Sequence, residues 1–195
     1  MILYYAPGTC SQACHIALIA AGLPYRLIQV GRDKQTEDGR DYKTINPKGY
    51  TPALELDDGT ILTENLAILV YIAETSGKLL PTAGLERFRT LEATAFMTTE
   101  IHRNFIPFFS PDSTAAEKDK AAQTLAFRFS SLDAQLADKP LLTGAQLSVA
   151  DAYLFVMLSW AAMMGITVSA RLQSYFERIK QQPAVQQALR EEGLA

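Results

Sequence analysis

The stretch Ile2-Leu3-Tyr4-Tyr5-Ala6-Pro7-Gly8-Thr9-Cys10-Ser11 opens the chain with a short β-prone run, a turn and the start of a helix. Ala6 to Thr9 should break the strand, because proline and glycine favour turns. Apolar side chains recur at helical spacing over residues 10–21, and Gly22-Leu23-Pro24 should end that helix. A second strand pattern covers residues 25–30. A strand, a helix and a strand within about 30 residues predict a βαβ unit with parallel strands.

The residues that follow, up to position 77, complete an α/β domain in the sequence pattern. Asp57-Asp58-Gly59 lies between two β-prone runs, which is a strong hairpin signal. The polar segment 31–49 favours a loop with one short helix ahead of Asn46-Pro47. The order over residues 1–77 is therefore β-α-β-(α)-β-β-α. Its last predicted elements are strands at 53–56 and 60–62 and a helix at 65–73.

Residues 84–195 carry helix patterns and no strand signal, so we expect an all-helical second domain after a junction at 76–81. The pattern at 148–165 is mostly apolar and predicts the buried central helix of a bundle. Pro107 should stop or kink the long helix that precedes it. The predicted helices cover residues 85–106, 115–136, 148–165, 171–181 and 184–191.

The composition is that of a compact globular protein, because 48% of the 195 residues are hydrophobic and 20% are charged. The formal net charge of −3 leaves no basic excess for a phosphate backbone, so we expect no nucleic-acid partner. No run of about 18 apolar residues predicts a membrane span, and the N-terminus lacks the pattern of a signal peptide. The cytoplasm is the expected compartment, where Cys10 and Cys14 would stay reduced.

Cys10 is placed where the first predicted strand turns into the first helix. The first N–H groups of a helix have no partner inside it, and the helix dipole is positive there. Both effects favour a thiolate, so we expect a lowered pKa and raised reactivity for Cys10. A buried structural thiol is the alternative, and position alone does not decide between the two. Cys14 lies one turn later, shares the apolar spacing of the helix and is interpreted as a core residue.

Five motifs in a fixed order resemble those of a known family. The chain resembles a cytosolic glutathione transferase, most closely the bacterial cysteine-containing or beta-type branch, over essentially its whole length. The resemblance implies a thioredoxin-like, glutathione-binding domain over 1–77. It also implies a helical domain over 84–195 that forms the acceptor-substrate side of a cleft. The motifs are Tyr5-Ala6-Pro7-Gly8-Thr9-Cys10-Ser11, Asn46-Pro47-Lys48-Gly49-Tyr50-Thr51-Pro52-Ala53-Leu54, Leu62-Thr63-Glu64-Asn65, Glu100-Ile101-His102 and Leu147-Ser148-Val149-Ala150-Asp151-Ala152-Tyr153.

The resemblance implies how the first domain would bind glutathione. A cis peptide bond before Pro52 would present the Thr51 N–H and C=O to the cysteinyl backbone of glutathione, whereas an ordinary trans proline is the alternative. Glu64 would pair with the α-ammonium and the Asn65 N–H with the α-carboxylate of the γ-glutamyl end. The alternative for Glu64 is an acid that favours the helix dipole. Lys34 aligns with a lysine that reaches the glycyl carboxylate in relatives.

Catalytic roles implied by the resemblance fall on Cys10, Ser11 and His102. Ser11 could donate its hydroxyl to a thiolate, cap the helix, or do both. His102 would lie over the thiol site and donate a hydrogen bond to sulfur or to substrate. A lone histidine on a helix is more often a packed or surface residue. Glu100 and Arg103 would help at the cleft or across a dimer interface.

The remaining interpretations concern packing and the second substrate. Tyr5 contacts the thiol in some relatives, but a packing role is favoured here. Relatives often carry an asparagine where this chain has Ala95-Phe96-Met97, so one polar contact to glutathione would be missing or replaced. Ser148 and Asp151 form a capping box, and His15 is interpreted as structural. The candidate apolar lining, or alternatively plain core, is Phe105, Phe108, Phe109 and Trp160.

We expect an enzyme that conjugates glutathione to small electrophiles, with possible Cys10-dependent thiol–disulfide exchange. One alternative makes glutathione-dependent thioltransferase or peroxidase chemistry the main activity. The C-x-x-x-C spacing would suit a mixed disulfide with glutathione and not an internal dithiol cycle. Another alternative is a non-catalytic, ligand-binding dimer of the same fold. The expected partners are glutathione as co-substrate, a hydrophobic electrophile and a second copy of the chain, with no metal and no membrane.

Overall fold

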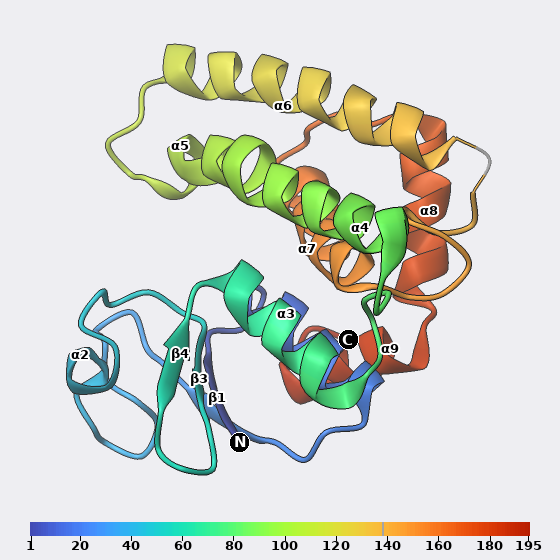
Figure 1. Cartoon of the computed structure of the whole chain (residues 1–195). Helices are drawn as coiled ribbons and strands as arrows, with labels where there is room; N and C mark the ends of the chain where they lie inside the picture. The colour runs from blue at the N-terminus through green and yellow to red at the C-terminus, as the bar shows by residue number, and fades with distance from the viewer. Residues whose placement is uncertain (138) are drawn as a thin grey trace. The chain divides into compact units, whose positions relative to one another are not determined.

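The computed structural model describes residues 1–137 and 139–195, and it divides the chain into two compact units. Unit 1 comprises Met1–Thr82 together with Gln182–Ala195, and unit 2 comprises Ala83–Gln181. Unit 1 is an α/β unit, and the described part of unit 2 contains helices and no strand of a sheet (Figure 1). The predicted fold class, an α/β domain followed by a helical domain, is therefore confirmed.

A four-stranded mixed sheet with the strand order β2-β1-β3-β4 forms the centre of unit 1. β1 and β2 are parallel, with Ile2 opposite Arg26, as the βαβ pattern predicts. β3 is antiparallel to both β1 and β4, which confirms the hairpin around Asp57-Asp58-Gly59. The strands are β1 (Ile2–Tyr5), β2 (Arg26–Gln29), β3 (Ala53–Glu55) and β4 (Ile61–Thr63).

Two helices that pack against each other accompany the sheet, α1 (Ser11–Ala21) and α3 (Asn65–Ser76). α1 ends at Gly22, whose φ of 73° lies in the left-handed region that glycine adopts readily. Its amide donates to the carbonyl groups of Leu18 and Ile19, which satisfies the last turn. The short α2 (Tyr42–Ile45) occupies the long polar loop. Its Tyr42 is buried in a cluster with Tyr4, Ile28, Val30 and Ala53.

The last helix, α9 (Pro183–Glu191), belongs to unit 1 and packs on α1. Figure 1 shows α9 in red near the C-terminus. The sequence pattern instead extends the second domain over 84–195. The difference arises because a helix pattern does not say which neighbour covers its apolar side. Here Val185 and Ala188 are fully buried in unit 1.

Unit 2 is arranged around α7 (Val149–Met163), which is buried along most of its length, as its apolar composition predicts. Ser148 and Asp151 form the predicted capping box at its start. α7 packs against α4 (Gly84–Phe96) and α8 (Ala170–Lys180). The longest helix of the described chain, α6 (Ala115–Leu136), packs instead on the segment that follows α4.

The predicted helix over 85–106 is interrupted in the structure. After α4 the chain forms a π-helical turn, η1 (Met97–Ile101), then a 3-10 turn, η2 (His102–Phe105), and α5 (Ile106–Phe109). The change therefore begins well before Pro107, which lies in the first turn of α5, where its missing N–H removes no bond. Threonine hydroxyls of α4 and η1 donate to carbonyl oxygens four residues earlier, an arrangement that bends helices.

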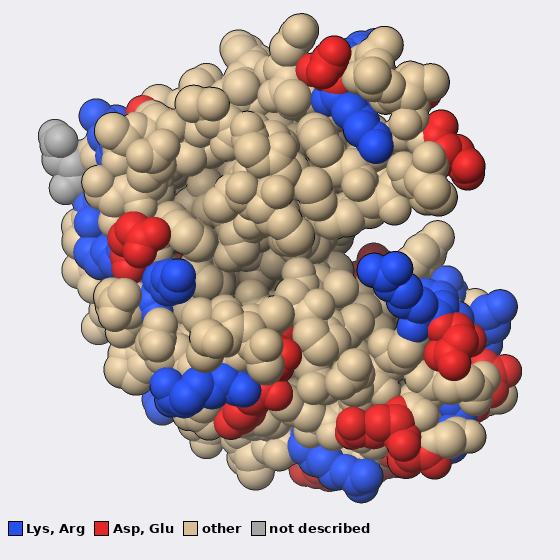
Figure 2. Space-filling model, turned by 180° about the vertical axis from the view of Figure 1, so that it is seen from behind, with Lys and Arg blue, Asp and Glu red and all other residues tan. Residues whose placement is uncertain are grey.

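The described surface mixes basic and acidic side chains. Figure 2 shows blue and red residues interspersed on the visible face, most of which is uncharged. Of the helices within residues 1–137 and 139–195, none combines the length and the apolar composition that crossing a membrane requires.

Candidate active site

Cys10 directly precedes α1, and its backbone is already helical, with φ −58° and ψ −20°. Its Sγ donates a hydrogen bond to the carbonyl oxygen of Thr51 at 3.5 Å. The residue is buried, with 9% of its surface exposed. The strand–turn–helix junction therefore brings the predicted thiol to the residue that precedes Pro52.

Burial raises the pKa of Cys10 to about 12, and the charge of Glu64 raises it further, whereas the amides of Cys10 and Ser11 lower it. The expected lowering of the pKa is therefore wrong. The helix start does stabilise a thiolate, but removing the thiolate from water costs more than those amides return. At neutral pH the side chain is a neutral thiol that can donate a hydrogen bond.

Ser11 uses its hydroxyl to close the turn before the helix. Its Oγ donates to the Ala6 carbonyl at 3.1 Å and accepts from the Ala6 amide at 3.2 Å. It also lies 2.8 Å from the Thr9 hydroxyl oxygen. Ser11 is fully buried, so its hydroxyl fixes the backbone of the turn that leads into Cys10.

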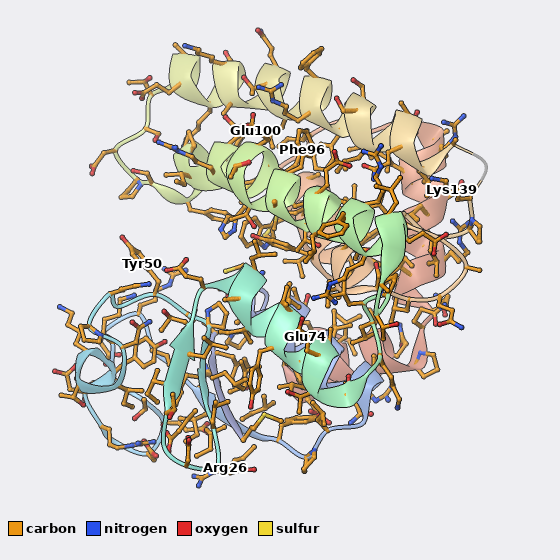
Figure 3. All side chains as sticks on the ribbon, in the orientation of Figure 1. Arg26, Tyr50, Glu74, Phe96, Glu100 and Lys139 are labelled. Carbon is orange, nitrogen blue, oxygen red and sulfur yellow. The ribbon has the colours of Figure 1, made fainter. Side chains whose placement is uncertain are left out.

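The Thr51-Pro52 peptide bond is cis, as the resemblance implies. Within residues 1–137 and 139–195, no group accepts a hydrogen bond from the Thr51 amide. The preceding Tyr50 is 75% exposed and extends outward from the loop (Figure 3). Its carbonyl accepts bonds from the Tyr42 hydroxyl at 2.8 Å and the Asn46 side chain at 2.7 Å, so a buried framework fixes this loop.

Glu64 and Asn65 mark the start of α3. Glu64 has a φ of 74°, which is unusual for a residue other than glycine, and such backbone strain is concentrated at functional sites. Its exposed carboxylate accepts from Lys48 Nζ at 2.6 Å. Lys48 lies in the same loop as Thr51 and is not among the site residues predicted from the sequence. The signal that could have identified Lys48 is its positive charge, opposite to that of Glu64, at a position only a few residues from Thr51.

The Asn65 side chain is oriented by α1. Its Oδ1 accepts a hydrogen bond from Cys14 Sγ at 2.9 Å, and its Nδ2 is buried with no partner in the described structure. Burial raises the pKa of Cys14 well above the ordinary range, so it remains a thiol donor. The interpretation of Cys14 as a core residue holds for its burial, but the residue also contacts a predicted binding residue.

Two further candidates of unit 1 have mainly structural contacts. Tyr5 is buried and lies against the His15 ring, with 6.2 Å between ring centroids, which agrees with the favoured packing role. Lys34 has a φ of 64°, and its carbonyl accepts from the Tyr42 amide at 2.9 Å. The Lys34 backbone thus anchors the polar loop that carries its side chain.

In unit 2, His102 starts the 3-10 turn that follows the π turn. Its Nδ1 lies 2.6 Å from the hydroxyl of Tyr153, and its ring meets that of Trp160 edge to face at 5.0 Å. Burial lowers the pKa of His102, so the imidazole is neutral at pH 7. π turns are often found at functional sites because they redirect the side chains that follow.

Glu100 and Arg103 lie on the same irregular segment and have different surroundings. Glu100 forms an ion pair with Arg128 of α6 at 2.9 Å. Figure 3 shows Glu100 on the side of its segment that faces α6. Arg103 is exposed, and no described residue pairs with it. A side chain already paired inside its own unit is a weaker ligand candidate than an exposed one, so Arg103 is favoured over Glu100.

The predicted aromatic lining divides into core and surface. Phe105 is fully buried and contacts Phe108, Phe129 and Trp160 edge-on or tilted. Phe109 is 50% exposed and lies 4.8 Å from Trp160. Phe109 is therefore the most exposed member of this group and offers apolar surface to a ligand.

Comparison with known proteins decides the family. The domain family described as "Glutathione S-transferase, N-terminal domain" matches residues 8–75, and "Glutathione S-transferase, C-terminal domain" matches residues 96–183. Glutathione S-transferase GstA of Escherichia coli O157:H7 is 37% identical over 200 residues, and the match covers 100% of both chains. This chain belongs to the glutathione S-transferase family.

Solved glutathione S-transferases agree with this assignment. A sphingomonad glutathione S-transferase complexed with glutathione is 43% identical, with a TM-score of 0.93 and full coverage of both chains. The bacterial beta class glutathione S-transferase of Sphingomonas chungbukensis is also 43% identical, with a TM-score of 0.94 and the same coverage. The resemblance to the beta-type branch of the glutathione S-transferases is thus confirmed.

The described residues show no group of three or more His, Cys, Asp or Glu side chains that could hold a metal ion. In this glutathione S-transferase, the predicted site residues form one set in each unit. Unit 1 brings together Cys10, Ser11, Thr51, Pro52, Glu64 and Asn65. Unit 2 carries Glu100, His102 and Arg103 on one irregular segment.

Proposed function

We propose that the protein is a glutathione transferase that joins the thiol of glutathione to small hydrophobic electrophiles. The unpaired Thr51 amide beside the Cys10 thiol carries this proposal, because an extended peptide can pair with such a backbone edge. The relatives named as glutathione S-transferases, one of them solved with glutathione, support the same ligand.

The proposed docking of glutathione uses groups of unit 1. Its cysteinyl backbone pairs with the N–H and C=O of Thr51, the residue that precedes the cis peptide bond to Pro52. Its α-carboxylate binds the open N–H groups of the first turn of α3, beginning with Asn65. Its α-ammonium pairs with Glu64. The Glu64 carboxylate is exposed, so it can release Lys48 and bind the ligand ammonium instead. Lys34 remains the proposed partner of the glycyl carboxylate.

In the proposed reaction the glutathione thiol loses its proton to solvent and its sulfur attacks the electrophilic carbon. A carbon–sulfur bond forms, and the leaving group departs with its bonding electrons. The neutral thiol of Cys10 supports this role, because it can donate a hydrogen bond to the glutathione sulfur as charge develops there. The neutral imidazole of His102 is a second proposed donor, and Arg103 and Phe109 are proposed for the side of the second substrate.

Thiol–disulfide exchange through Cys10 is the alternative reaction. It requires a Cys10 thiolate, because the thiolate is the attacking species. The pKa of about 12 in the free protein works against that species, so conjugation is the favoured reaction.

A binding experiment tests the proposal. Glutathione binding is measured by calorimetry for the wild type, Glu64→Ala and the control Glu37→Ala, which removes another exposed acid of unit 1. We expect Glu64→Ala to weaken binding about tenfold or more, because a charge-assisted bond contributes roughly 1.5–3 kcal/mol. Glu37→Ala should bind like the wild type. Equal binding by all three proteins contradicts the docking, and absence of binding by the wild type contradicts the function.

The catalytic part is tested with a chlorodinitrobenzene as electrophile. Conjugation should be retained by a Cys10→Ala protein in part, whereas reduction of a glutathione mixed disulfide should be abolished if Cys10 attacks it. A wild type that reduces the disulfide but does not conjugate favours the alternative reaction. A wild type that binds ligands and catalyses neither reaction is the non-catalytic dimer.

We also propose a homodimer in a reducing compartment such as the cytoplasm. Large apolar side chains on α4 and α6 support a second copy as partner, because Leu85, Phe88 and Phe127 are each more than 60% exposed. Both cysteines are free thiols, which suits a reducing compartment. Light scattering should give twice the 21.5 kDa of one chain, and Phe88→Asp should shift the mass toward one chain. A wild-type mass of one chain contradicts the dimer.

A further inference from the structure

The segment after α9 reaches the turn that precedes Cys10. Glu192 Oε2 accepts a hydrogen bond from the Gly8 amide at 2.9 Å and another from Gln12 Nε2 at 3.1 Å. The other carboxylate oxygen, Oε1, lies 2.9 Å from His15 Nδ1. The side chains of Glu192 and His15 are both fully buried, so these bonds replace water.

His15 connects the same segment to α1. Its Nε2 lies 2.8 Å from Glu191 Oε2, so its two ring nitrogens contact two consecutive carboxylates. A carboxylate oxygen accepts, so the ring nitrogen that carries a proton donates to the carboxylate facing it. Glu191 also accepts from the Tyr25 hydroxyl at 2.8 Å. This network fastens the end of α9 to the buried side of α1.

Gly8 lies at the centre of the turn and is fixed from both sides. Its φ of 67° lies in the left-handed region, and Leu194 Cδ1 is 3.5 Å from where a Cβ of Gly8 would stand. On the other side, the Ser11 hydroxyl bonds both backbone groups of Ala6. The backbone that leads into Cys10 is therefore fastened by Ser11 from α1 and by Glu192 from the C-terminal segment.

We propose that Glu192 is a positioning residue of the active site, whose carboxylate fixes the Gly8 turn and thereby the backbone and solvent access of Cys10. Glu192 touches no reacting atom. Its effect on turnover rests on the proposed function, but its control of the Cys10 thiol does not. The C-terminal segment, which the helix pattern assigns to the second domain, thus completes the site of the first.

The test compares Glu192→Gln with Glu191→Gln. Glutamine in place of Glu192 directs an amide N–H at one of the donors Gly8, Gln12 and His15, so at least one bond is lost. Exchange of the Gly8 amide is followed by NMR. Alkylation of Cys10 by iodoacetamide is followed by peptide mass analysis, which separates Cys10 from Cys14. Both measurements are made under conditions in which the protein is folded, and without glutathione.

We expect Glu192→Gln to speed Gly8 exchange and Cys10 alkylation about tenfold or more, because a bond to a buried charge is lost. Loosening the turn exposes the thiol to water and to the reagent at once. Glu191→Gln leaves the bonds to Gly8 and Gln12 in place, and both rates should stay within about twofold of wild type.

A Glu192→Gln protein that melts earlier but keeps the wild-type exchange and alkylation rates would overturn the proposal, since its role would be structural only. If Glu192→Gln does not fold, Glu192→Asp is measured in its place. Its shorter side chain keeps the charge but cannot reach all the donors, and it should show the same two changes in smaller degree. Unchanged rates in that variant also overturn the proposal. Failure of the wild type to bind glutathione contradicts the proposed function alone.

Discussion

The Sγ atom of Cys10 lies 3.5 Å from the carbonyl oxygen of Thr51, and Cys14 Sγ, one helical turn further along α1, lies 2.9 Å from Asn65 Oδ1. The two thiols, one directly before α1 and one in its first turn, therefore contact the residue before the cis proline and the first residue of α3. These are the two backbone elements proposed to bind the cysteinyl backbone and the γ-glutamyl α-carboxylate of glutathione. The spacing between them is set by a single turn of α1.

Burial of Cys10 predicts a loss of stability in alkaline solution. The rise of its pKa from 9.0 to about 12 corresponds to about 4 kcal/mol. Because the folded-state pKa is the higher one, this contribution is complete below about pH 9 and is lost as the pH rises toward 12. The free energy of unfolding in urea should therefore fall steeply above about pH 9.

The Cys10→Ala protein provides the control for this prediction. It lacks the titrating group, so its stability should fall less between pH 8 and about pH 10.5 than that of the wild type. Cys14 titrates in both proteins, so the difference between the two curves belongs to Cys10. Parallel curves would show that Cys10 is not held as a neutral thiol by burial.

Local patterns in the sequence predict most of the fold, because helix ends, turns and caps depend on residues that are close together in the chain. Gly22 marked the end of α1, Asp57-Asp58-Gly59 marked the hairpin, and Ser148 with Asp151 marked the start of α7. The helical spacing does not predict the π turn at Met97, where threonine hydroxyls donate to backbone carbonyls in an arrangement that often bends helices. The placement of α9 was missed because it depends on tertiary burial.

The site was predicted in its residues but not in its electrostatics. Position at a helix start argued for a thiolate at Cys10, yet the sequence does not contain the degree of burial that reverses the direction of the pKa. In the same way, the bond from Glu192 to Gly8 joins residues 184 positions apart and leaves no local signal. Lys48 could have been predicted from the sequence, because it belongs to the motif that contains Thr51.

The ion pair between Lys48 and Glu64 predicts an effect on glutathione binding. Both side chains are more than half exposed, so removing the pair with Lys48→Met should change the free energy of unfolding by less than about 1 kcal/mol. Glu64 is then available to the ligand ammonium, and the Kd for glutathione should fall by up to about fivefold. The control Lys43→Met removes an exposed lysine with no bond to Glu64. Weaker binding by Lys48→Met would instead make Lys48 a ligand of glutathione.

The bond between His102 and Tyr153 predicts a defined tautomer. If the Tyr153 hydroxyl donates to Nδ1, the proton of the neutral ring resides on Nε2, where it can serve as a donor. Nitrogen NMR of the wild type should show this tautomer at pH 7, and Tyr153→Phe should mix the two forms. The variant should also lose roughly 1–2 kcal/mol of stability, since a buried partner is removed. A pure Nδ1–H form in the wild type would contradict the donor role of Nε2.

Asp151 predicts a larger stability effect than its place in a capping box implies. Oδ1 accepts from the Leu142 amide at 2.9 Å and the Tyr175 hydroxyl at 2.6 Å, whereas Oδ2 accepts from both the amide and the hydroxyl of Ser148. Asparagine offers a single acceptor oxygen, so Asp151→Asn leaves a fully buried donor facing an N–H group. The free energy of unfolding in urea should fall by about 3 kcal/mol or more.

Ser169→Ala is the control, because Ser169 caps α8 through a bond to the Leu172 amide and its hydroxyl otherwise donates only to the Asp133 carboxylate in an exposed bond. Losing that cap should cost about 1 kcal/mol. Equal losses from the two variants would mean that Asp151 acts as a helix cap only. A loss for Asp151→Asn about threefold that of Ser169→Ala would instead show that this carboxylate joins the start of α7 to α8 and to the loop before it.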